Sequence, residues 1–113
     1  MRSVRPPFLL SPFILAELDY LLSTRVGAEA QRSLLEEVAQ GAYQLEPFDA
    51  GDIRRANEIL TQFADLDVGL ADASIVVLSE RHGTNRVLTL DERHFRALRG
   101  KDGRAFRLLP ADS

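Results

Sequence analysis

Three carboxylates in this 113-residue chain stand where the surrounding sequence is apolar, namely Glu17, Asp72 and Asp91. Glu17 lies inside FILAELDYLL, Asp72 opens LADASIVVL, and Asp91 closes VLTL. Each has an ordinary structural explanation, which is a salt bridge for Glu17 and a helix cap for the two aspartates. An ionised carboxylate in apolar surroundings is nevertheless costly unless it is paired or bound to a cation. Three such residues together predict an acidic cluster held by a divalent cation.

The composition of the chain narrows the choice of that cation. The sequence has no cysteine and two histidines, which excludes thiolate sites and disfavours an all-imidazole zinc site. Magnesium or manganese suits carboxylate oxygens, and magnesium keeps several of its waters, so widely spaced carboxylates can serve it. Such a site favours metal-assisted hydrolysis of a phosphodiester.

Basic residues gather in the C-terminal third of the chain. Residues 1–80 carry six Lys/Arg against 13 Asp/Glu, whereas residues 81–107 carry eight against three. This asymmetry favours a polyanionic partner, although a solvated basic face that needs no partner is the plainer alternative. Arg93 and Arg96 follow Asp91 closely and are the candidates for phosphate contacts beside the site, with Arg81, Arg86 and Lys101 further along the same path.

Strands and helices alternate along the chain and would position these residues. Ser11-Pro12 predicts a helix start, Asp49 opens a further helix, and Gly41 and Gly83 follow the ends of two helices. The predicted strands are 8–10, 43–47, 86–90 and 105–110, and the predicted helices are 12 to about 26, 28–40, 50 to about 63, 70–83 and 92–99. This order predicts an α/β fold with a short, mainly parallel sheet.

The length of the chain predicts one domain over residues 1–113. No apolar run approaches the roughly 20 residues that a membrane span requires, and the absence of cysteine suits a reducing cytoplasm. We therefore expect a cytoplasmic protein without a membrane partner.

Two segments of the sequence resemble the PIN-domain ribonucleases, specifically the VapC-type toxins of bacterial toxin–antitoxin pairs. They are SPFILAELDYLL (11–22) and GLADASIVVLSERHGTNRVLTLDERHF (69–95). The resemblance implies a three-layer α/β/α domain and an Mg²⁺- or Mn²⁺-dependent endoribonuclease that cuts single-stranded segments of RNA. It implies that Glu17, Asp72 and Asp91 are the metal ligands and catalytic acids. It also implies a cognate antitoxin that covers the acidic cleft, and a homodimer.

The chain departs from the family pattern at its start. The family begins with a strand ending in Asp, which is a further ligand and lies at the centre of the sheet, whereas no Asp or Glu precedes Glu17 here. The strand–helix unit that carries this Asp is therefore expected to be missing, through a late start or degeneration. A sheet that lacks its central strand leaves backbone groups unpaired, which predicts association with a second copy or with an antitoxin.

Two alternatives to an active ribonuclease follow from the same residues. A catalytically inactive remnant could still bind antitoxin as a decoy, which the absent first Asp favours. A small phosphate-binding α/β module is the other alternative, but the chain has no G-x-G-x-x-G motif and no P-loop. His94, where some relatives carry a further acid, is assigned to the surface or to an RNA-facing position and not to a metal ligand.

Overall fold

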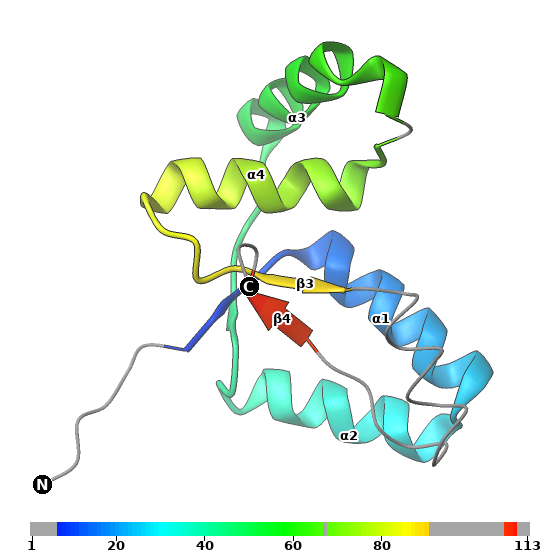
Figure 1. Cartoon of the computed structure of the whole chain (residues 1–113). Coiled ribbons are helices and arrows are strands. Elements are labelled where there is room, and N and C mark those ends of the chain that lie inside the picture. Colours follow the sequence, from blue (N-terminus) through cyan, green and yellow to red (C-terminus); the bar gives the residue numbers. More distant parts are fainter. Residues whose placement is uncertain (1–6, 67, 91–107, 111–113) are drawn as a thin grey trace, which may run out of the picture.

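The computed structural model describes residues 7–66, 68–90 and 108–110 (Figure 1). The elements in order are β1 (Leu9–Leu10), α1 (Pro12–Arg25), α2 (Ala28–Ala39), β2 (Gln44–Leu45), α3 (Ala50–Gln62), a 3-10 turn η1 (Ala64–Leu66), α4 (Leu70–His82), β3 (Leu88–Leu90) and β4 (Leu108–Pro110). These bounds confirm the predicted helices and strands within the described residues, with shorter strands than expected. The helix predicted over 92–99 lies outside the described residues.

The helix ends follow from local side-chain and backbone chemistry. The Ser11 hydroxyl accepts the backbone N–H groups of Phe13 and Ile14 at 3.0 and 3.4 Å, which satisfies two donors at the start of α1. Asp49 and Asp52 form a capping box at the start of α3, each carboxylate accepting from the other residue's backbone. Gly83 ends α4 at φ +61°, a left-handed conformation that glycine adopts without steric cost.

Among the described residues, three of the four strands run parallel. Leu9 and Leu10 of β1 pair with Gln44 and Leu45 of β2, and on its other side Leu9 forms a single parallel bridge to Val87 just before β3. β4 runs antiparallel to β3. The short β1 therefore lies between β2 and β3, and the prediction of a short, mainly parallel sheet is confirmed.

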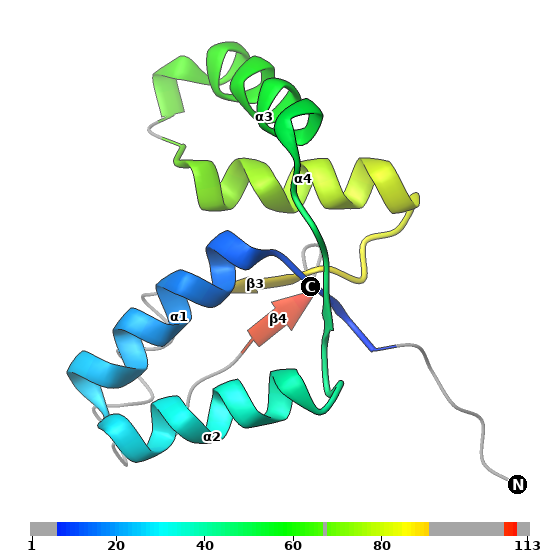
Figure 2. The ribbon, with the colours of Figure 1, turned by 180° about the vertical axis from the view of Figure 1, so that it is seen from behind.

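Helices cover the strands on both sides. Figures 1 and 2 show α3 and α4 on one side of the strands and α1 and α2 on the other, which is the expected three-layer arrangement. The main core joins the strands to α1, α2 and α4, and its fully buried side chains include Leu10, Ile14, Leu18, Leu22, Leu78, Val87 and Leu88.

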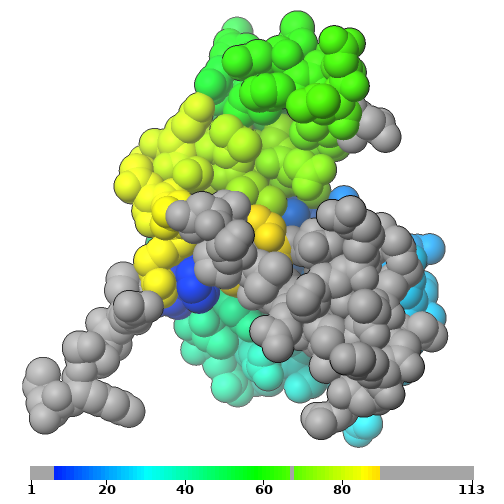
Figure 3. Space-filling view, viewed as in Figure 1, coloured from blue at the N-terminus to red at the C-terminus, as the bar shows by residue number. Residues whose placement is uncertain are grey.

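A second, smaller core joins α3 to α4. Ala56 and Ile59 of α3 meet Ala73 and Val77 of α4, and the two alanines allow the helices to approach closely. In the space-filling view this helix pair forms the upper part of the molecule (Figure 3). Among the described residues, no helix is long and apolar enough to cross a membrane.

Candidate active site

A buried pair of hydroxyl groups joins the helices that carry Glu17 and Asp72. The oxygens of Ser11 and Ser74 lie 2.6 Å apart, and both residues are fully buried. Ser74 also donates to the carbonyl of Ala71 at 2.6 Å. Because Ser74 has one hydroxyl proton, the Ser11 hydroxyl must donate to Ser74. The start of α1 is thereby fastened to the first two turns of α4.

Glu17 lies on the border of the buried face of α1. Ile14, Leu18, Leu21 and Leu22 form that face, and at about 100° per residue Glu17 stands roughly 85° from its centre. Its side chain is exposed, so the apolar environment predicted for it is wrong. Glu17 interacts with another group of the protein, and its position is compatible with a salt bridge and with a metal ligand.

Asp72 lies in the first turn of α4 with its side chain exposed. The N-cap of this helix is Gly69, so the explanation of Asp72 as the cap itself is wrong. A carboxylate in the first turn still interacts favourably with the positive end of the helix dipole. The opposite side of α4 is buried against the sheet and α3, and the exposed side carries Asp72 and, one turn later, Val76.

Asp91, Arg93 and Arg96 lie outside the described residues. The strand that leads to Asp91 is nevertheless described: β3 packs against both α1 and α4, which also pack against each other. In Figures 1 and 2 the carboxyl end of β3 lies beside α1, on the same side of the molecule as the first turn of α4. The structure thus brings together α1 and α4, which carry Glu17 and Asp72, and the strand that precedes Asp91.

The donor chemistry of these acids fits magnesium or manganese, which prefer carboxylate oxygens. Within residues 7–66, 68–90 and 108–110, no three His, Cys, Asp or Glu side chains are grouped closely enough to hold a metal ion. Glu17 and Asp72 are the two predicted ligands in this part, and both reach solvent, where a cation and a phosphate could approach them.

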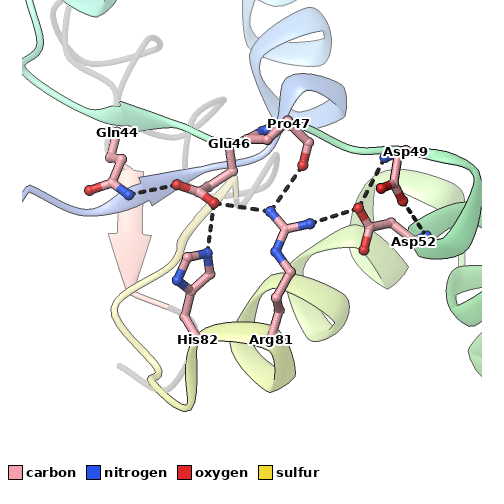
Figure 4. A network of polar contacts seen from close by, with 7 residues as sticks. All are labelled: Gln44, Glu46, Pro47, Asp49, Asp52, Arg81 and His82. Atoms are coloured by element: carbon pink, nitrogen blue, oxygen red, sulfur yellow. Dashed lines mark hydrogen bonds and ion pairs between the residues drawn. The ribbon is translucent and has the colours of Figure 1, made fainter.

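A second polar cluster, which the sequence did not reveal, surrounds the buried carboxylate of Glu46 (Figure 4). Glu46 directly follows β2 and is 7% exposed. Its carboxylate lies 2.6 Å from Nε2 of His82 and accepts hydrogen bonds from Gln44 at 2.6 Å and from Arg81 at 3.0 Å. Burial raises the pKa of Glu46, but the hydrogen bonds from Gln44, His82 and Arg81 together outweigh it and hold the pKa below its ordinary value.

The Arg81 guanidinium links this carboxylate to the start of α3. It donates to Asp52 at 2.6 Å and to the carbonyl of Pro47 at 2.9 Å, in addition to Glu46. A backbone hydrogen bond from Asp49 is the largest cause of the lowered pKa of Asp52, and Arg81 lowers it further. The cluster therefore ties the end of β2, the first turn of α3 and the last turn of α4 together.

The structure shows the surroundings of two of the basic residues that were expected on the RNA path. Arg81 was expected on a path for RNA phosphates, and in the structure its guanidinium is engaged by two carboxylates and a carbonyl. Arg86 precedes β3, and its guanidinium lies 4.2 Å from the centre of the Phe8 ring, a cation–π contact near the start of β1. Arg86 therefore lies at the ends of the strands opposite to the one from which the chain continues to Asp91.

Comparison of the sequence with known proteins identifies its relatives. Residues 3–101 match the PIN domain. The chain is 46% identical over 102 residues to Ribonuclease VapC26 of Mycobacterium tuberculosis, and the alignment covers 90% of this chain and 76% of that protein.

Proposed function

The chain belongs to the PIN-domain family, and we propose that it is an endoribonuclease toxin that cuts single-stranded segments of RNA with the help of Mg²⁺ or Mn²⁺. The observation that carries this proposal is the 46% identity to Ribonuclease VapC26 over nine-tenths of the chain. The packing of α1, α4 and β3 supports it, because α1 and α4 carry Glu17 and Asp72 and the chain continues from β3 to Asp91.

In this proposal Glu17, Asp72 and Asp91 hold the cation and are the catalytic acids. When bound, the cation supplies Lewis acidity toward the phosphate and the attacking water. Glu17 and Asp72 are exposed on neighbouring helices, so an extended RNA strand can reach them without a rearrangement of the core. Arg93 and Arg96 contact phosphates beside the cut, since cationic side chains position the backbone without reading its sequence.

We also propose a protein partner for the same site. A cognate antitoxin would cover the exposed acids and so block access of RNA, and the active form would be a homodimer. The competing proposal is a remnant that binds the antitoxin without cutting RNA.

Cleavage of single-stranded RNA by the purified protein tests the proposal. We expect cutting with Mg²⁺ or Mn²⁺, none with a chelator, and recovery when metal is restored. Glu17→Gln, Asp72→Asn and Asp91→Asn should each lower the rate by at least about 100-fold, as loss of a group that stabilises the transition state does.

Asp65→Asn is the matched control, because Asp65 is an exposed aspartate on η1, outside α1, α4 and β3. It should cut RNA at the wild-type rate. Wild-type protein that binds an antitoxin but does not cut any RNA with either metal would establish the decoy instead. Full activity in Asp72→Asn would remove Asp72 from the site.

A further inference from the structure

An exposed aromatic side chain stands one helical turn from Glu17. Tyr20 is 65% exposed, although tyrosine carries a large apolar ring that proteins usually cover. It follows Glu17 by three residues on α1, which places the two side chains about 60° apart on the same side of the helix. The ring of Tyr20 is therefore offered to solvent directly beside a proposed metal ligand.

The neighbours of α1 explain why this side of the helix stays open. The helix uses one face for the main core, and Asp19 faces α2, where its carboxylate accepts a hydrogen bond from Gln31 at 2.6 Å. Glu17 lies about 160° around the helix from Asp19, so it points away from α2. Glu17 and Tyr20 thus lie on a side of α1 that α2 does not cover.

The helix that carries the second acid shows the same pairing. Val76 follows Asp72 by four residues on the exposed side of α4 and is 39% exposed. Glu17 and Asp72 therefore each have an exposed apolar side chain about one turn away on the same helix. A cleft that bound only a metal ion and phosphate would need no such apolar surface, whereas the bases of single-stranded RNA present apolar faces that stack on aromatic side chains.

We propose that Tyr20 binds substrate by stacking on a base of single-stranded RNA next to the phosphate that is cut. This inference rests on the proposed ribonuclease function and specifies how its site holds the RNA. The aromatic ring of Tyr20 offers a base an apolar face, and the stacked base sets the strand in register over Glu17. Stacking accepts any base, so Tyr20 contributes affinity and position with little sequence preference.

The test measures binding and stacking separately from cleavage. Single-stranded RNA carrying 2-aminopurine at successive positions is titrated into the Asp72→Asn protein, which leaves the RNA uncut. Stacking on Tyr20 quenches the fluorescence at one or two adjacent positions. We expect Tyr20→Ala in this background to weaken binding about 5- to 150-fold, the range that base–aromatic stacking spans, and to abolish the quenching.

Tyr20→Phe and Tyr20→Trp should keep both the affinity and the quenching, because they keep an aromatic face. Leu35→Ala is the matched control, since Leu35 is an exposed apolar residue (39%) on α2 and should change neither measurement. In the protein with Asp72 intact, Tyr20→Ala should raise KM and leave kcat within about twofold.

Three outcomes would overturn the inference. One is unchanged RNA affinity in Tyr20→Ala while the wild type still cuts RNA, which leaves the ribonuclease function standing. Another is a Tyr20→Ala protein that loses antitoxin binding or self-association but keeps its affinity for RNA, which would make Tyr20 a protein-contact residue. The third is a wild type that neither binds nor cuts single-stranded RNA, and there the proposed function fails as well.

Discussion

Ser11 and Ser74 are 63 residues apart in the chain, yet their hydroxyl oxygens lie 2.6 Å apart in the interior. Ser11 caps α1 and Ser74 belongs to the second turn of α4, so this hydrogen bond sets how the helix of Glu17 meets the helix of Asp72. A pair of small buried hydroxyls tolerates little displacement, because each oxygen already has further partners.

Replacement of Ser74 by alanine tests the contribution of this hydrogen bond to stability. Ser74→Ala leaves the Ser11 hydroxyl proton buried without its acceptor, and we expect the free energy of unfolding to fall by about 1–3 kcal/mol. Urea denaturation measures this change. Ser23→Ala is the control, since the Ser23 hydroxyl contacts the Tyr20 carbonyl on the exposed side of α1, and it should change stability by less than about 0.5 kcal/mol. Equal effects of the two substitutions would show that the hydrogen bond between Ser11 and Ser74 contributes nothing to stability.

Removal of Arg81 tests the cluster around Glu46. Arg81→Ala takes away the guanidinium that neutralises a carboxylate with 8% side-chain exposure, and we expect a loss of about 2–3 kcal/mol. Arg55→Ala is the matched control, because Arg55 forms a bidentate ion pair with Glu80 at 2.8 Å on an exposed surface. Its removal should lower the free energy of unfolding by less than the removal of Arg81. A larger loss in Arg55→Ala would contradict this ranking.

The same cluster predicts how stability depends on pH. Because the pKa of folded Glu46 lies below the ordinary value of 4.5, its ionised form is favoured by folding. This stabilisation is complete above pH 4.5 and is lost as the pH falls through the lower folded pKa. As the pH falls below 4.5, Glu46→Gln should therefore lose less stability than the wild type.

Denaturation at a series of acidic pH values compares the two proteins. Glu36→Gln, an exposed glutamate on α2, should follow the wild-type curve. A Glu46→Gln curve parallel to the wild type over this range would show that the carboxylate gains nothing from its partners.

Arg93 and Arg96 predict a salt-dependent affinity for RNA. If both contact phosphates, binding should weaken steeply with salt. Arg93→Ala/Arg96→Ala should then lower the affinity across RNA sequences. It should also reduce the slope of log K against log salt concentration by roughly 1.4, about 0.7 for each contact on a single strand. Fluorescence anisotropy in the Asp72→Asn background measures both quantities. Arg32→Ala/Arg54→Ala removes the same charge from α2 and α3 and should leave the slope unchanged. An unchanged slope in the first variant would place the RNA elsewhere.

Local chemistry made the helices predictable from sequence. Ser11-Pro12, Asp49 and Gly83 mark helix ends through contacts within four or five residues, so their effect needs no knowledge of the fold. The order of strands and helices likewise determined the α/β class, and the segments around Glu17 and Asp72 indicated the family without reference to the tertiary structure.

Long-range packing decided what the sequence could not. Glu46 and Arg81 are 35 residues apart, and only the fold makes one of them buried and the other its partner, so the sequence did not reveal this contact. The exposure of Glu17 depended on which of its apolar neighbours the core used: Ile14 and Leu21 are buried, whereas Tyr20 is left in solvent. Helical periodicity shows which residues share a face, but the neighbouring elements determine which faces are covered, and that is a property of the tertiary structure alone.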